Sequence, residues 1–145
     1  MSNAVRYRCA FYALIAIAAL LGTGSENLHV QGTSPIQLFA NFLAGLKVNA
    51  ASRSISIDIS LFLLAGATFM IVEARRLRIR LVWVYVVLSF LVAVSVTFPI
   101  FLLAREVRLA RMDQAPTKVE LTTLDYAGIA LTTALVLWVC WYLKT

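Results

Sequence analysis

Four stretches of apolar sequence, each approaching the thickness of a lipid bilayer, dominate this chain of 145 residues. A helix needs about 20 predominantly apolar residues to cross the hydrocarbon core. The stretches predict membrane spans at about residues 7–23, 51–74, 81–104 and 125–143. The composition agrees, because 61% of the residues are hydrophobic and only 14% are charged. We therefore expect an all-α integral membrane four-helix bundle, with residues 1–145 forming a single transmembrane domain.

The first stretch has a second interpretation. Arg6 and Arg8 precede an apolar run that ends near the small residues 22–24, which is also the pattern of a secretory signal peptide. We interpret the run as a retained helix, with Arg8 extending its side chain toward the interface.

A short helix is expected between the first two spans. Residues 33–35 (Thr-Ser-Pro) are typical of a helix start, because a capping hydroxyl precedes a proline at the first helical position. The apolar residues that follow recur at helical spacing: Ile36, Phe39, Leu43 and Leu46. The segment 35–47 is too short to cross a bilayer, so we predict an amphipathic helix in the interface. A re-entrant hairpin is the alternative.

Residues 49–60 alternate small polar residues or Asp with Ile, a period typical of a strand. The apolar run nevertheless continues to Val72, and an open strand edge leaves backbone groups unsatisfied in lipid. We therefore predict a helix for the second span.

The net charge of +6 lies in short loops and chain ends. The densest group is Arg75, Arg76, Arg78 and Arg80, between the second and third spans. Short basic loops favour the cytoplasmic side, so we predict cytoplasmic N and C termini, although four straight spans leave the Lys and Arg nearly balanced across the membrane. Basic loops also predict contact with anionic lipids. We expect no nucleic-acid binding, because no soluble basic domain is present.

Asp58 lies about 10 Å inside the second span at 1.5 Å per residue. A carboxylate at that depth is costly and needs a partner. A straight antiparallel hairpin centred near residue 78 would place Asp58 opposite position 98, which makes Thr97 and Arg105 the expected partners. This cluster is interpreted either as a structural clasp or as a site that handles protons or cations.

Glu73 lies three residues before Arg76, a spacing that predicts an interfacial ion pair on one helix. Small residues also recur in two spans, and such faces allow close helix contact within the bundle or with another subunit. They are residues 65–67 (Ala-Gly-Ala), Gly128 with Thr132, and Ala130 with Ala134.

Residues that commonly carry catalysis or bind metals are sparse. His29 is the single histidine and lies in a polar loop, while Cys9 and Cys140 form no CxxC pair. No phosphate loop, zinc-protease signature or nucleophile–base pair is recognisable. We therefore expect no catalytic residues, no metal site and no enzyme activity, and we leave cofactor binding open.

Several motifs carry a family resemblance: Asp58, residues 72–76 (Val-Glu-Ala-Arg-Arg), Trp83, and residues 98–106 (Phe-Pro-Ile-Phe-Leu-Leu-Ala-Arg-Glu). The last string is similar to a Pro-Leu-Phe-Leu-x-x-Arg-Glu pattern, with Ile100 where Leu is usual. Through these motifs the block from about Ser54 to Arg108 resembles a bacterial family of small integral membrane proteins classed as a domain of unknown function. The resemblance implies a three-helix core in the bacterial inner membrane or in an organellar equivalent such as the thylakoid. It implies no activity.

Two functions are compatible with these features. The first is a non-catalytic accessory or structural subunit of a larger membrane complex, which contacts its partners through the small-residue helix faces. The alternative is a small homo-oligomeric transporter or channel, coupled to protons or cations through Asp58.

Overall fold

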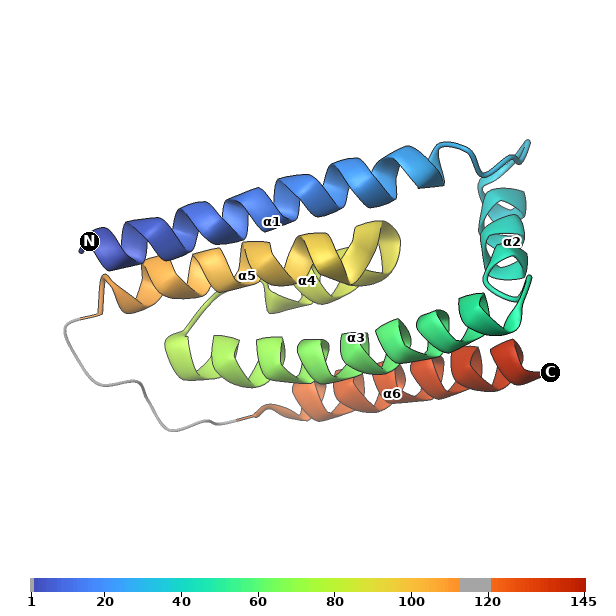
Figure 1. Ribbon diagram of the computed structural model, residues 1–145. Helices are drawn as coiled ribbons and strands as arrows, with labels where there is room; N and C mark the ends of the chain where they lie inside the picture. Colours follow the sequence, from blue (N-terminus) through green and yellow to red (C-terminus); the bar gives the residue numbers. More distant parts are fainter. Residues whose placement is uncertain (1, 113–120) are drawn as a thin grey trace.

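The computed structural model describes residues 2–112 and 121–145, and every regular element within them is helical (Figure 1). Four helical segments are long and apolar enough to cross a membrane, which confirms the predicted all-α class and fits a multi-pass membrane protein. The elements in chain order are α1 (Asn3–Asn27), α2 (Pro35–Gly45), α3 (Ala50–Leu77), α4 (Val82–Leu88), the π-helical η1 (Ser89–Ala93), α5 (Val94–Leu109) and α6 (Thr123–Lys144).

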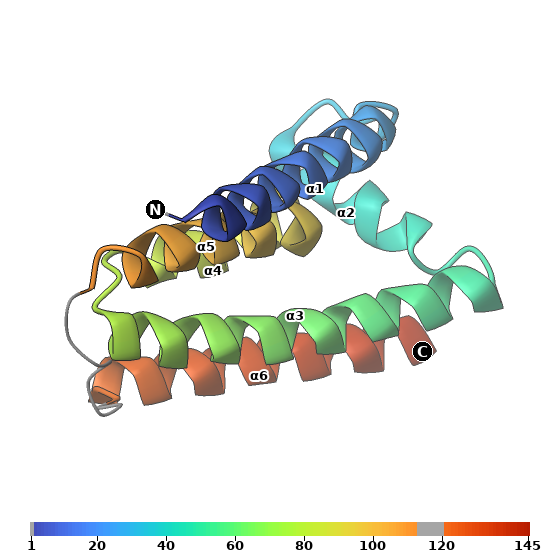
Figure 2. The same ribbon diagram turned by 60° about the vertical axis from the view of Figure 1, so that its left-hand side comes forward.

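The short helix α2 begins where the sequence predicts. Ser34 caps it by accepting a hydrogen bond from the Gln37 backbone N–H at 3.2 Å, and Pro35 occupies its first turn. The helix has no buried residue, and it lies across one end of the bundle between the end of α1 and the start of α3 (Figure 2). A short helix between the first two spans is therefore confirmed.

The third apolar segment does not run straight. In a continuous helix, Tyr85 and Phe101 would lie about 24 Å apart along the axis, yet their ring centroids are 5.5 Å apart. Ser89 Oγ and Thr97 Oγ1, eight residues apart, are separated by only 2.6 Å. The chain reverses at Ala93, whose extended backbone (φ −178°, ψ 143°) ends one helical run and precedes the next. Helices α4 and α5 thus form a hairpin whose two ends lie at the same end of the bundle (Figure 1).

Two hydroxyl groups stabilise the turn of this hairpin. Thr97 Oγ1 lies 3.1 Å from the carbonyl oxygen of Ala93, and Ser89 Oγ lies 2.8 Å from the carbonyl oxygen of Tyr85. Both side chains are almost fully buried. Backbone that departs from a regular helix is tolerated at membrane depth only where its polar groups find partners, and these hydroxyls supply two of them.

The hairpin extends about half-way along α3. Val94, at the start of α5, packs with Leu63 near the middle of α3. The packed core lies between this contact and the C-terminal end of α3. It includes Phe101, Met70 and Ile71, which are fully buried. The bundle is therefore filled by the hairpin over only half of its length.

The two ends of the bundle differ in charge. We call the end that carries the N-terminus and residues 75–80 the arginine end, and the opposite end, which carries α2 and the C-terminus, the α2 end (Figure 1). Because the hairpin returns, residues 105–111 also lie at the arginine end. The two termini lie at opposite ends, which differs from the prediction of both termini on one side; that prediction assumed four straight crossings.

Helix α6 packs along α3 and receives a side chain from the hairpin. A Cβ atom built on Gly128 would lie 1.8 Å from the Trp83 ring, so only glycine allows this contact. Trp83 is partly buried and packs against the core of the bundle. A Cβ atom built on Gly66 would lie 3.6 Å from the Phe98 ring, an ordinary contact distance, so Gly66 also faces the interior of the bundle. These two small-residue sites serve contacts within the chain.

Candidate functional site

A network of ion pairs joins three helices at the arginine end. Glu73 on α3 accepts hydrogen bonds from Arg76, at 2.6 Å, and from Arg105 on α5, at 2.8 Å. The pair with Arg76 is the one that the sequence predicts. The pair with Arg105 connects residues 32 positions apart and holds the end of α5 against the end of α3.

The network continues to the first helix. Glu106 Oε2 accepts two hydrogen bonds from Arg8, at 2.8 and 2.9 Å, while its other oxygen lies 3.3 Å from Arg105. The Glu73 and Glu106 side chains are only 8% exposed, so each carboxylate is removed from solvent beside two guanidinium groups. Arg108 completes this connection by donating to the Leu77 carbonyl oxygen, at 2.9 Å, where α3 ends.

A second ion pair attaches α6 at the same end. Arg75 binds both oxygens of Asp125 at 2.7 Å. The Thr122 backbone N–H and hydroxyl also donate to Asp125 Oδ2, at 2.9 and 2.8 Å, as part of a capping box at the start of α6. The Asp125 side chain is fully buried, and its lone pairs are well satisfied. Such bidentate, charge-assisted pairing favours burial of the carboxylate.

The structure does not bring Asp58, Thr97 and Arg105 together, so the predicted cluster is wrong. Asp58 is exposed on α3 and forms no hydrogen bond or ion pair within the part of the chain that the structure describes. Thr97 stabilises the hairpin turn, and Arg105 pairs with Glu73 and Glu106. The physical reason is the reversal at Ala93, which moves Arg105 to the arginine end and away from the depth of Asp58.

The isolated residues considered for metal binding remain isolated. The His29 ring Nδ1 lies 2.8 Å from the carbonyl oxygen of Ser25. Cys9 and Cys140 are free and partly buried. Across residues 2–112 and 121–145, no group of three or more His, Cys, Asp or Glu side chains is placed to hold a metal ion.

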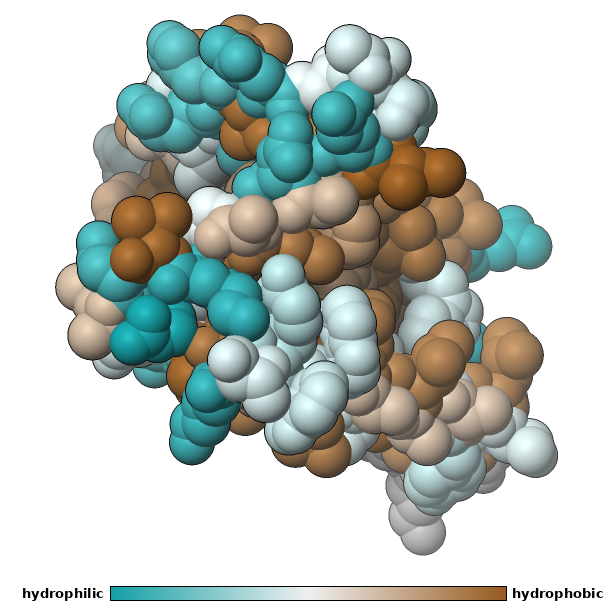
Figure 3. Space-filling view, turned by 90° about the vertical axis from the view of Figure 1, so that its right-hand side faces the viewer, coloured by the Kyte–Doolittle hydropathy of each residue, from teal (hydrophilic) through white to brown (hydrophobic). Residues whose placement is uncertain are grey.

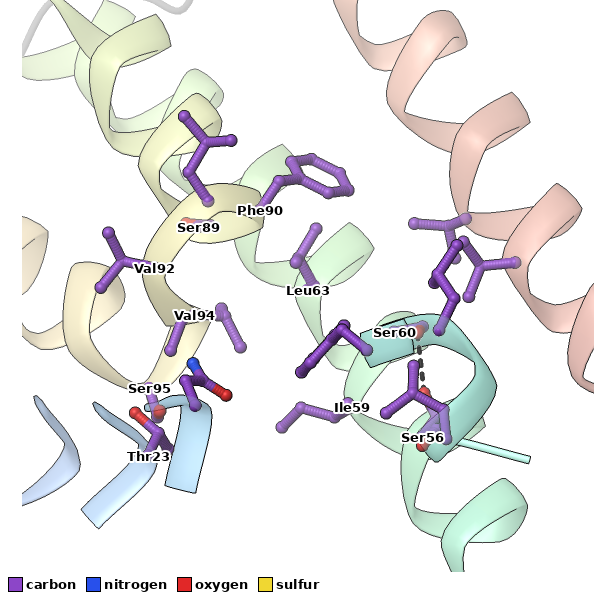
Figure 4. Close-up of a pocket in the computed structure, with 18 of the residues that line it drawn as sticks. Thr23, Ser56, Ile59, Ser60, Leu63, Ser89, Phe90, Val92, Val94 and Ser95 are labelled. Atoms are coloured by element: carbon purple, nitrogen blue, oxygen red, sulfur yellow. Dashed lines mark hydrogen bonds between the residues drawn. The ribbon is translucent and has the colours of Figure 1, made fainter. Parts of the chain in front are cut away.

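A cavity of about 690 Å³ occupies the half of the bundle that the hairpin does not fill. Its walls come from the end of α1, the start of α3 and the end of α6. The hairpin turn lies on one side of it, and α2 on another (Figure 4). Seen from the α2 end, hydrophobic residues lie in a hollow between hydrophilic ones (Figure 3). The lining is mostly aliphatic and aromatic, with Thr23, Glu26 and Asn27 contributing polar atoms from α1. Sequence reasoning missed this cavity, since it exists only because the third segment reverses.

The family model described as DUF2834, proteins of unknown function, matches residues 11–107. The match covers more than half of the chain, so this protein belongs to that family. No curated protein and no solved structure matched the chain. The matched region contains most of α1, together with α2, α3 and nearly all of the hairpin; α6 lies outside it.

The motifs that carried the resemblance now have structural positions. Glu73, Arg105 and Glu106 form the ion-pair network, while Pro99 and Phe101 are buried inside the hairpin. Most of the motifs therefore hold the hairpin in its reversed path. Asp58 is the exception, since nothing in the described structure explains its presence.

The ion pairs predict a difference between two Asp→Asn substitutions. Asp125→Asn removes the bidentate partner of Arg75 and weakens the cap of α6, so it should lower the free energy of unfolding by about 1–3 kcal/mol. Asp58→Asn, at an exposed position without partners, should change it by less than about 0.5 kcal/mol. Denaturant unfolding in detergent micelles, followed by circular dichroism, measures both. A larger loss in Asp58→Asn than in Asp125→Asn would contradict this assignment.

Proposed function

We propose that this protein is a non-catalytic accessory subunit of a larger membrane complex and that α6 is its docking helix. The supporting observation is the outer face of α6. Three alanines, Ala127, Ala130 and Ala134, are exposed at positions i, i+3 and i+7 and so form one stripe along the helix. Small residues on one face allow another helix to approach closely in a membrane.

Two further features support α6 as the docking element. Its opposite face already packs inside the protein, through Gly128, Thr132 and Val136. The alanine stripe is therefore not needed to hold the bundle together. In addition, α6 follows the segment matched by the family model, as an element added to a common core would.

The alternative function, a transporter or channel that uses Asp58, gains no comparable support. Asp58 lies outside the residues that line the cavity. The hydroxyl groups of Thr23 and Ser60 in the lining donate to backbone carbonyl groups of their own helices, at 2.7 Å in each case. They are therefore less available to ligate an ion or to order a file of water molecules.

The arrangement of charges supports one orientation in the membrane. All described arginines except Arg53 lie at the arginine end, whereas the α2 end carries Lys47, Arg53 and Lys144. Because cytoplasmic segments carry the excess of Lys and Arg, we place the arginine end in the cytoplasm, or in the organellar equivalent, and in contact with anionic lipids. The N-terminus then faces the cytoplasm and the C-terminus the opposite side.

Cysteine labelling tests this orientation. In a background of Cys9→Ser and Cys140→Ser, Thr145→Cys should react with a membrane-impermeant maleimide added to the outer face of sealed, right-side-out vesicles. Arg78→Cys should react only after the vesicles are opened. Labelling of Thr145→Cys solely after opening would overturn the orientation.

The proposed docking role predicts that bulky residues on the alanine stripe release the partner. The full-length protein, extracted in mild detergent at its natural expression level, should migrate in a complex that contains another membrane protein in fixed ratio. Ala130→Leu combined with Ala134→Leu should return it to the free protein, because the added side chains separate the two helices. Ala18→Leu, at an exposed position of α1, is the matched control and should leave the complex intact.

Two results would count against the proposal. Migration of the unaltered protein as a monomer or as a pure homo-oligomer would remove the accessory role. An intact complex in the double variant would remove α6 as the docking helix.

A further inference from the structure

We propose that the cavity at the α2 end binds one acyl chain of a phospholipid whose headgroup carries an ammonium group. Side chains from α1, α2, α3, η1, α5 and α6 line the cavity, so its shape depends on how all of these elements pack together. This inference goes beyond the accessory role and does not depend on it.

The wall of the cavity is chemically apolar despite several hydroxyl groups. Ser60 Oγ donates to the Ser56 carbonyl oxygen at 2.7 Å, and Thr23 donates in the same way within α1. The Ser89 hydroxyl lies within hydrogen-bonding distance of the Tyr85 carbonyl oxygen and the Thr97 hydroxyl at the hairpin turn. Figure 4 shows the side chains of Ile59 and Leu63 among the apolar groups that line the space. A wall made largely of apolar side chains, in which several of the hydroxyl groups are bonded within their own helices, favours hydrocarbon over water.

The size of the cavity suits a narrow apolar ligand. The cavity holds about 690 Å³. A single hydrocarbon chain is much narrower than a helix. Small-molecule sites in proteins commonly occupy about 300–1,000 Å³.

The position of the cavity determines how such a chain enters. It extends from the hairpin turn, half-way along α3, toward α2 at the end of the bundle. A phospholipid with its headgroup at that end can place one chain in the cavity and leave the other in the bilayer. Phe39 and Phe42 of α2 line the space and would cover the bound chain near its headgroup.

The charge near the end of α1 selects the headgroup. Among the described residues that line the cavity, Glu26 is the one that carries a charge, and Asn27 lies beside it in the sequence. Glu26 forms no ion pair within the described residues, and its side chain is exposed. A carboxylate in this position attracts an ammonium group, whereas the cations at this end, Lys47, Arg53 and Lys144, lie outside the lining. Phosphatidylethanolamine carries such an ammonium group, whereas phosphatidylglycerol carries none.

Native mass spectrometry of the full-length protein, with lipid removed and then added back, tests the proposal. The unaltered protein should retain one molecule of phosphatidylethanolamine in preference to phosphatidylglycerol. Ile59→Trp places a large ring in the cavity and should abolish this adduct. Ile55→Trp, one turn away on an exposed part of α3 outside the lining, is the matched control and should retain it. Glu26→Gln should reduce the preference for phosphatidylethanolamine by about two- to fivefold, as expected for a solvent-exposed ion pair.

Three outcomes would overturn the proposal: no one-to-one adduct in the unaltered protein, equal loss of lipid in both Trp variants, or a preference for phosphatidylglycerol. Circular dichroism and the thermal midpoint establish that each variant is folded. If Ile59→Trp does not fold, the smaller change Ile59→Phe replaces it and should weaken the adduct. An unchanged adduct in a folded Ile59→Phe protein would then contradict the assignment.

Discussion

The ion pairs at the end of α5 determine the path of the whole chain. Arg105 and Glu106 lie near the end of a largely apolar segment, and they pair with Glu73 of α3 and Arg8 of α1 at 2.8 Å. Charged groups are costly in hydrocarbon, so this cluster belongs near one face of the membrane. The end of α5 must then return to the face from which α4 began. The separation of charge between the two ends, the opposite positions of the termini and the unfilled half of the bundle all follow from this return.

A reversal inside the membrane requires compensation, and the hairpin supplies it in two ways. The hydroxyl groups of Ser89 and Thr97 lie within hydrogen-bonding distance of backbone carbonyl groups beside the turn. Close aromatic contacts, such as the one between Tyr85 and Phe101, then join the two arms. These contacts form because α5 reverses; a straight segment would expose the same rings to lipid. The reversal also leaves the cavity beyond the turn, and this cavity is the part of the structure suited to binding a ligand.

The local elements could be predicted from the sequence, whereas the direction of the third segment could not. Hydropathy marked the four apolar segments, the cap at Ser34 marked α2, and the i, i+3 spacing marked the Glu73–Arg76 pair. Hydropathy reports that residues 81–104 prefer an apolar environment, but it does not report which way the chain travels. The reversal occurs at Ala93 without glycine or proline, in an extended conformation that any residue adopts. The pairs Arg105–Glu73 and Arg75–Asp125 join distant parts of the chain, so no local spacing indicated them. The assumption that the third segment is straight also produced the false prediction of a cluster around Asp58.

A distance measurement between residues 80 and 111 tests the reversal most directly. Both arginines are exposed at the ends of the third segment, and each can be replaced by a spin-labelled cysteine after Cys9 and Cys140 are changed to serine. Pulsed electron paramagnetic resonance on the protein in lipid nanodiscs then gives the separation between the two labels. A straight helix would place these positions about 45 Å apart. The hairpin predicts less than half of that distance, and a distribution centred near 45 Å would contradict it.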